Sequence, residues 1–343
     1  MRTTTITTLY WILVAAGLAA VAATGGDLVG GEGHPALGAS LASLLPGPTF
    51  PVLAGLLALV VAGSVGWTAR SPGSTRPVVL GGAAALVLAL LTLSVELLAV
   101  VGYLPLAVVL APFHAGMRSG LVAAVDVGLV IQVGVLLGVV LWGRAVLRAL
   151  RAHPVTVPTW ARPEAAARWG RVAVVVSVVP PLGYAVTRFT WMFYPLGFSR
   201  DVWEAQHGSS ALLPGVWLGS FAVVGAVLTL GLTRRWGEVF PHWVPRLGGR
   251  PVPVALAVVP ASLVALLLVP SGISMIRRVL GPDAAFDPVA DWAAYGPTLL
   301  WPLWGVSLGA ATLAYALRRR GEQQDPPRVT RTGGAAHVRS ARP

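Results

Sequence analysis

The sequence predicts an all-α fold, a polytopic transmembrane helix bundle of about eight spans. Of the 343 residues, 55% are hydrophobic and only 11% are charged, whereas soluble domains average about 25% charged residues. The apolar residues gather in runs of about 20, the length that an α-helix needs to cross a bilayer. The chain has no cysteine, which excludes disulfides, thiolate metal sites and cysteine nucleophiles.

Eight apolar runs are long enough to be membrane spans. They are Thr7–Ala23, Pro51–Trp67, Val78–Gly102, Leu121–Trp142, Val172–Tyr194, Leu212–Leu232, Val252–Ser271 and Tyr295–Leu317. The apolar segment Tyr103–Gly116 is interrupted by Pro105 and Pro112, so it either extends the third span or lies at the membrane surface. Met1–Ala23 has an alternative interpretation as a cleaved signal peptide, because one early arginine precedes an apolar core and small residues.

The placement of arginine predicts the orientation. Every basic side chain apart from histidine is an arginine, a composition typical of a high-GC bacterium. If the N-terminus is cytoplasmic, the inner loops and the C-terminal segment hold most of the arginines, and the outer loops hold only Arg118, Arg200, Arg277 and Arg278. Because basic residues are retained on the cytoplasmic side, we expect a multi-pass protein of the bacterial plasma membrane with both termini in the cytoplasm.

The formal charge of +12 and the pI of about 11.4 would be compatible with nucleic-acid binding. The arginines lie in loops between apolar runs, however, which is how membrane topology is encoded. We therefore expect no nucleic-acid partner. The expected partners are the lipid bilayer and its anionic headgroups at the inner face.

The two halves of the chain show parallels. Ser43–Gly47 (SLLPG) opens the second span and Ala211–Gly215 (ALLPG) opens the sixth, and Arg-Pro-Val begins the span that follows each. These parallels suggest a 4+4 parallel repeat of residues 1–150 and 168–317 within a transmembrane domain of residues 1–317. Shared Leu/Pro/Gly composition explains them equally well.

The segment 318–343 is polar, basic and rich in proline and glycine. Such a composition predicts a disordered cytoplasmic tail that is attracted to anionic headgroups. Binding of a protein partner by this tail is the alternative.

Three ionisable residues fall inside the predicted spans, namely Glu96, Asp126 and Arg188. Counted at 1.5 Å per residue from the ends of their spans, all three are expected in the outer half of the bilayer. A guanidinium in hydrocarbon is costly and needs protein, water or a counter-ion. We expect the two carboxylates to surround Arg188, either as an ion-coupling or ligand-binding centre or as a structural ion pair.

Two aromatic residues share a helical face with Arg188, because Tyr184 precedes it by four residues and Trp191 follows it by three. A guanidinium over an aromatic ring is stabilised, so these two residues are candidates for lining a pocket. A place in the aromatic belt at the outer interface is the alternative for Trp191.

Asp201, Glu204 and His207 recur at a spacing that would place them along one ragged helical stripe. Such a set is able to hold a cation, although a solvated loop explains it better. The sequence indicates no cofactor. No Walker loop, HExxH, GxSxG or Rossmann fingerprint occurs in a suitable context, which favours a role other than catalysis.

The inner segment Arg234–Pro253 (RRWGEVFPHWVPRLGGRPVP) is more distinctive than its surroundings. It resembles a segment of multi-span integral membrane proteins of actinobacteria. The resemblance implies a bacterial plasma-membrane protein and transfers no catalytic residue. We expect a short interfacial helix here, anchored by Trp236, Phe240 and Trp243, with Glu238 and the arginines facing headgroups.

These observations favour a permease-like or small-molecule-handling membrane protein with Glu96, Asp126 and Arg188 at its polar centre. The alternative is a non-catalytic membrane scaffold or accessory subunit that recruits cytoplasmic partners. A membrane enzyme acting on a lipid-linked substrate comes third, because no set of nucleophile, base or metal ligands supports it.

Overall fold

The computed structural model describes residues 2–24, 40–45, 47–71, 74–110, 112–113, 126–152, 158–207, 212–281, 287 and 289–324. The long helices are α1 (Arg2–Ala23), α2 (Thr49–Arg70), α3 (Arg76–Thr92), α4 (Val95–Leu110), α6 (Val127–Ala152), α7 (Pro163–Thr190), α9 (Leu213–Gly231), α10 (Val254–Leu280) and α12 (Trp301–Gln324). The short elements are α8 (Arg200–His207), α11 (Trp292–Leu299) and the 3₁₀ turns η1 (Leu41–Leu44), η2 (Thr159–Ala161) and η4 (Arg235–Gly237). These ranges contain no β-strand, and the predicted all-α class is confirmed.

Seven helical segments of the described residues are long and apolar enough to cross a membrane, and α3 together with α4 would make an eighth. The prediction of a polytopic helical membrane protein is therefore confirmed. The third span, predicted as the single run Val78–Gly102, is not one continuous helix, because it bends by 81° at Leu93 and Ser94. Beyond the bend α4 continues to Leu110 with Pro105 inside it, so the first part of the segment Tyr103–Gly116 extends this span.

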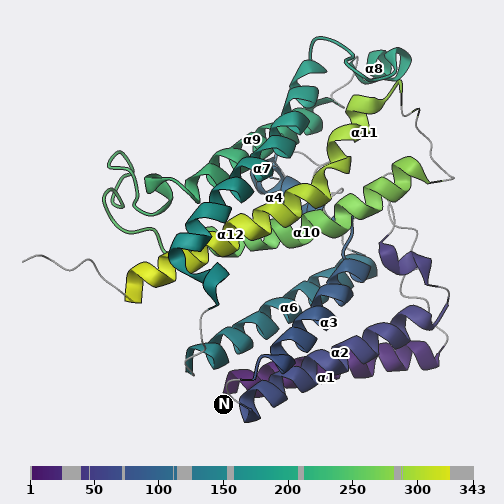
Figure 1. Ribbon diagram of the computed structural model, residues 1–343. Coiled ribbons are helices and arrows are strands. Elements are labelled where there is room, and N and C mark those ends of the chain that lie inside the picture. The colour runs from purple at the N-terminus through teal and green to yellow at the C-terminus, as the bar shows by residue number, and fades with distance from the viewer. Residues whose placement is uncertain are drawn as a thin grey trace, which may run out of the picture.

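The helices form two groups (Figure 1). Helices α1, α2, α3 and α6 pack together, and α7, α9, α10 and α12 pack together with α11 beside them. Helix α4 connects the groups, because it packs on α10 and α9 as well as on α6. The bend between α3 and α4 therefore lies where the two groups meet.

The two groups are packed differently. In the first group the second and third spans, α2 and α3, are extensively in contact, whereas in the described part of the second group α9 packs mainly on α7. Helix α12 lies between α7 and α10. The repeat of residues 1–150 and 168–317 stays a prediction.

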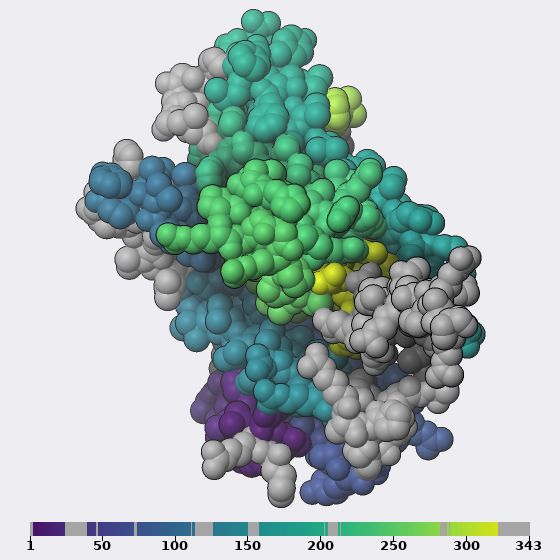
Figure 2. All heavy atoms as spheres, turned by 90° about the vertical axis from the view of Figure 1, so that its left-hand side faces the viewer, coloured from purple at the N-terminus to yellow at the C-terminus, as the bar shows by residue number. Residues whose placement is uncertain are grey.

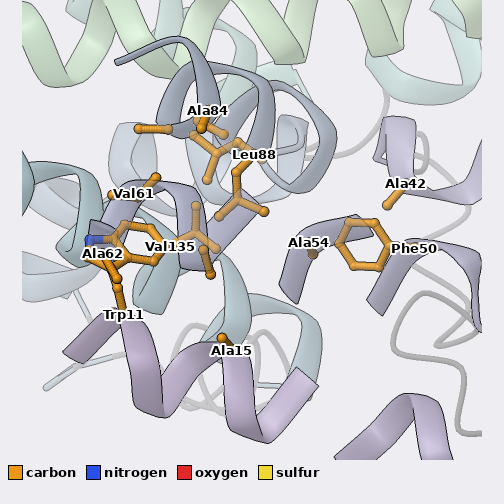
Figure 3. Packing of buried hydrophobic residues seen from close by; sticks show 14 of the residues in the cluster. Trp11, Ala15, Ala42, Phe50, Ala54, Val61, Ala62, Ala84, Leu88 and Val135 are labelled. Atoms are coloured by element: carbon orange, nitrogen blue, oxygen red, sulfur yellow. The ribbon is translucent and has the colours of Figure 1, made fainter. Parts of the chain in front are cut away.

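Each group encloses a core in which alanine is frequent. The first core contains Trp11, Phe50, Val61 and Leu88 from α1, α2 and α3 (Figure 3), and Leu267 of α10 reaches it from the other group. The second core is built around Tyr315 of α12 and its neighbours on α7 and α10. Small residues let neighbouring helices approach closely where lipid supplies no hydrophobic driving force between them.

Most of the arginine-bearing helix ends lie at one end of the molecule. There α2 ends at Arg70, α3 begins at Arg76, and α7 begins just after Arg162. The start of α1, the segment 232–253 and the end of α12 lie on the same side of Figure 1. Figure 2 looks onto this end and shows the segment 232–253 beside the yellow end of α12. We call it the arginine-rich end.

Candidate functional site

The bend between α3 and α4 falls at Leu93 and Ser94, so neither proline nor glycine causes it. Polar groups stabilise it instead. The backbone N–H of Ser94, which would otherwise continue the ladder of α3, donates to Oε1 of Gln132 on α6 at 2.9 Å. The Ser94 hydroxyl donates to the same oxygen at 3.2 Å and accepts the N–H of Glu96 at 3.3 Å. Serine competes in this way with the backbone of a helix, so the span is interrupted here.

A carboxylate follows the interruption directly. Glu96 lies in the first turn of α4 and is half-buried, and its Oε2 accepts a hydrogen bond of 3.4 Å from Nε2 of Gln132. Ser271 of α10 donates its hydroxyl to the carbonyl of Ser94 at 3.1 Å. We call Ser94, Glu96, Gln132 and Ser271 the interrupted-span cluster. It offers carboxylate, amide, hydroxyl and carbonyl oxygens, the ligands that hard cations prefer.

Arg188 is buried near the end of α7 and is enclosed by aromatic rings. Its guanidinium carbon lies 4.3 Å from the ring centroid of Tyr184 and 4.2 Å from that of Trp191. The charge therefore lies over two rings, and the face of each ring attracts a cation. Tyr103 on α4 and Tyr295 on α11 lie in the neighbourhood of the guanidinium.

Two backbone carbonyls of α11 accept hydrogen bonds from Arg188, and the hydroxyl of Thr187 accepts a longer one of 3.4 Å from Nη1. Nη1 donates to the carbonyl of Ala293 at 3.2 Å, and Nη2 donates to the carbonyl of Ala294 at 2.9 Å. In a regular helix the carbonyl of Ala293 would accept the N–H four residues further on. That position is Pro297, which has no N–H, so this carbonyl is available to the guanidinium.

The loop between α7 and α8 fixes α11 in front of Arg188. Ala293 donates its N–H to the carbonyl of Gly197 at 3.0 Å, and Asp291 accepts hydrogen bonds of 2.9 and 2.6 Å from the N–H and hydroxyl of Ser199. Gly197 has φ +52°, and a Cβ there would lie 2.5 Å from the indole nitrogen of Trp292. Only glycine suits this position.

The structure does not join the three predicted charges into one cluster. Asp126 is exposed, and its Oδ1 accepts the N–H of Leu129 at 2.7 Å, as a residue that caps α6 does. Glu96 bonds Gln132, and Arg188 bonds carbonyls and ring faces instead of a carboxylate. Among the described residues no carboxylate pairs with Arg188, so the expectation of two acids around it is corrected: carbonyls, a hydroxyl and aromatic rings contact the guanidinium there.

Sequence reasoning missed the uncharged members of the interrupted-span cluster. Ser94, Gln132 and Ser271 lie inside apolar runs, and that position was the available signal. It was weak, because serine inside a span commonly bonds a carbonyl of its own helix, as the hydroxyl of Ser307 does with Leu303. Which serine faces another helix depends on packing.

The proposed metal stripe lies on α8. Asp201 and Glu204 are exposed, and Nε of Arg200 forms a salt bridge of 2.8 Å with Oε1 of Glu204. This hydrogen bond raises the pKa of the Arg200 guanidinium. The side chain of His207 lies outside the described part of the chain. Among the described residues, no group of three or more His, Asp or Glu is placed to hold a metal ion.

One further carboxyl outside the spans has a shifted pKa. Oδ1 of Asp287 accepts the backbone N–H groups of Val289 and Ala290 at 2.7 and 3.1 Å. These hydrogen bonds favour the charged form, so the pKa of Asp287 lies below its usual value. Asp287 thereby orders the turn that leads into α11, which supplies the carbonyls bound by Arg188.

The inner segment Arg234–Pro253 does not form the expected interfacial helix. After the short turn η4 it folds back on itself, because the N–H of Phe240 bonds the carbonyl of Arg250 at 2.9 Å and the N–H of Val252 bonds the carbonyl of Glu238 at 2.8 Å. The prolines of the segment prevent a continuous helix. Trp243 is 82% exposed and Trp236 is 37% exposed, so the hairpin presents aromatic side chains at the arginine-rich end.

Helix α12 holds this hairpin in place. Nη1 of Arg318 forms a salt bridge of 3.0 Å with Oε1 of Glu238, and the hydroxyl of Tyr315 donates to the carbonyl of Gly237 at 2.8 Å. Because α12 continues to Gln324, residues 318–324 are helical, whereas the sequence predicted disorder from 318 onward. Residues 325–343 of the predicted tail lie outside the described residues.

Comparisons of the chain with protein-family profiles, curated proteins and solved structures give no match.

Proposed function

We propose that the protein is a permease-like membrane protein that binds a coupling ion, either a proton or an alkali cation, at the interrupted-span cluster. One observation carries this proposal: a membrane-spanning pair of helices is bent by 81° directly before Glu96, where the two groups of helices meet. Interrupted helices at the contact of two helical halves are where secondary transporters bind substrates and ions.

Physical chemistry supports ion binding at such a bend. The end of α3 carries the negative pole of its helix dipole and carbonyls without partners in the helix, and these attract a cation. Glu96 adds a carboxylate within reach of Gln132. Because Glu96 lies in the first turn of α4, its negative charge is also attracted to the positive pole of the dipole of that helix. Glu96 could therefore have a purely structural role, and the experiment must exclude this explanation.

Replacement of Glu96 by glutamine tests the proposal. We expect the purified wild-type protein to unfold at a higher temperature in an alkali chloride than in choline chloride of equal concentration, or to show a pH dependence that Glu96→Gln lacks. An ion at a hundred times its dissociation constant would add about 2.7 kcal/mol to the stability. Thermal unfolding in a neutral detergent measures this, with Glu164→Gln, an exposed carboxyl of α7, as the matched control.

Equal cation and pH dependence of wild-type protein and Glu96→Gln would contradict ion binding at this site. That result would favour the second candidate, a membrane scaffold or accessory subunit. A specific observation supports this candidate too, because Arg188 is buried and takes hydrogen bonds and ring contacts from the protein itself. Recruitment of a protein partner by residues 318–343 belongs to this candidate.

We further propose that the arginine-rich end faces the cytoplasm of a bacterial plasma membrane and contacts anionic headgroups. The arginines at the helix ends there, among them Arg70, Arg76 and Arg162, support this orientation. The absence of cysteine permits a direct test by single-cysteine labelling in intact cells. A membrane-impermeant maleimide should label Asp201→Cys and leave Arg250→Cys unlabelled until the cells are opened; the reverse pattern would invert the topology.

A further inference from the structure

Helices α1 and α2 lie side by side at the edge of the first group (Figure 1) and leave an open groove between them on the outer surface of the molecule. The residues that line it are Thr4, Thr5, Thr8, Leu9, Ile12, Leu59, Ala62, Gly63, Gly66, Ala69 and Arg70. Leu9, Ile12 and Leu59 are about half exposed along it, at 53%, 44% and 50%. The groove faces the side of the bundle, where lipid would lie.

The two ends of the groove differ in chemistry. At the arginine-rich end, Arg70 of α2 lies opposite the threonines of the first two turns of α1. Arg148 of α6 donates a hydrogen bond to Oγ1 of Thr3, which places a second guanidinium near the same end of α1. Further along, the lining is leucine, isoleucine, alanine and glycine. The groove thus has a cationic, hydroxyl-bearing end and an apolar stem.

Two glycines of α2, Gly66 near the cationic end and Gly63 in the apolar stem, shape the groove. A Cβ at Gly66 would lie 3.1 Å from Nη1 of Arg70, so the guanidinium lies back along α2 toward the apolar stem. Gly63, one turn deeper, has no neighbouring atom within 4 Å of a Cβ. The groove is open there because Gly63 has no side chain that would fill it.

The groove extends over most of one leaflet. From Thr4 to Ile12 the rise along α1 is about 12 Å, and from Gly66, beside which the guanidinium of Arg70 lies, to Leu59 the rise along α2 is about 10 Å. Half of a hydrocarbon core of about 30 Å is about 15 Å. A single acyl chain anchored at Arg70 would therefore run along the stem to its end.

We propose that this groove binds one anionic phospholipid, with its phosphate at Arg70 and one acyl chain along Leu9, Ile12 and Leu59. A guanidinium pairs with a phosphate through charge-assisted hydrogen bonds, and apolar helix surfaces take the chain. The site is independent of the ion proposed at Glu96, which lies on α4, so either proposal can fail alone.

Native mass spectrometry of the purified protein tests the site with phosphatidylglycerol and phosphatidylcholine of identical acyl chains. We expect one phosphatidylglycerol to be retained at a concentration at which phosphatidylcholine is not. Arg70→Gln should weaken this binding about fivefold, the usual effect of one basic residue near an anionic lipid surface. Gly63→Leu should abolish it, because the added side chain fills the stem without meeting another atom at its Cβ.

Two controls accompany these variants. Gly183→Leu adds the same side chain to an exposed glycine of α7 that also has open space around it, and Arg250→Gln removes an exposed arginine of the hairpin; both should bind phosphatidylglycerol as the wild type does. Equal retention of both lipids, displacement of the lipid by inorganic phosphate alone, or a dimer that Gly63→Leu dissociates would each overturn the proposal. The last outcome would assign the groove to a second copy of the chain.

Discussion

Replacement of Arg188 by leucine is expected to lower the free energy of unfolding by about 3 kcal/mol. The carbonyl of Ala293, for which Pro297 supplies no N–H, would lose its donor, and that of Ala294 would lose one hydrogen bond; an unsatisfied buried polar group costs about 1–3 kcal/mol. The two ring contacts with Tyr184 and Trp191 would be lost as well, at about 0.5–2 kcal/mol each. The avoided cost of burying a charge offsets part of this sum. Thermal or denaturant unfolding in detergent measures the difference.

Arg200→Leu is the matched control, since it removes an arginine of the same loop region that is 82% exposed. Its salt bridge with Glu204 joins exposed residues four apart on α8, and exposed pairs of this kind contribute little to stability. Arg188→Lys should give an intermediate loss, because one ammonium cannot reproduce the flat two-nitrogen contact with adjacent carbonyls. Equal stability of Arg188→Leu and Arg200→Leu would show that the carbonyl and ring contacts of Arg188 do not stabilise the fold.

Gly305→Ala is expected to lower the free energy of unfolding by about 2–3 kcal/mol, the usual cost of overpacking a tight contact. Gly305 lies where α12 crosses α10, and a Cβ there would meet Cγ2 of Val269 at 2.7 Å and the carbonyl oxygen of Ala265 at 2.9 Å. The backbone oxygen cannot rotate away, so the two helices must separate. Helix α12 also holds α7 and the hairpin 234–253, and we expect the loss to appear in unfolding and in the yield of folded protein.

Gly309→Ala, one turn further along α12, provides the comparison. A Cβ there would meet Cβ of Ala265 at 3.7 Å, an ordinary contact. Because alanine favours a helix over glycine by about 1 kcal/mol, this variant should be as stable as the wild type or slightly more stable. A similar loss of stability in both variants would mean that the crossing of α10 and α12 is not limited by the space at Gly305.

The surroundings of Arg188 and of Glu96 suit different roles. At Arg188 the guanidinium is enclosed by rings and carbonyls of the protein, an arrangement that ties α7 to α11. At Glu96 the carboxylate follows an interruption of the backbone and has an amide as its neighbour. Tyr103 lies seven residues beyond Glu96, about 10 Å along α4, and its side chain lies in the neighbourhood of Arg188. Helix α4 therefore runs from the first site toward the second, and an ion bound at Glu96 would act on this helix.

The special position of Arg188 and its aromatic neighbours were predictable, and its hydrogen-bond acceptors were not. A guanidinium in an apolar run must be satisfied, and the spacing of Tyr184 and Trp191 placed both rings on its face of α7. The carbonyls of Ala293 and Ala294 lie more than a hundred residues further along the chain. A carbonyl carries no signature in a sequence; only the position of Pro297, which frees one of them, hints at it.

The sequence alone determined that this protein is a bundle of membrane-spanning helices whose arginines gather at one end. Length and hydropathy suffice for this, because in hydrocarbon a chain must satisfy its own backbone hydrogen bonds and does so locally, within each helix. The tertiary structure decided where the third span bends, which residues satisfy Glu96 and Arg188, and that Asp126 stands apart from both. These contacts join residues distant in the chain through groups that face one another only after the helices have packed, and the periodicity of a single helix carries no information about its neighbour.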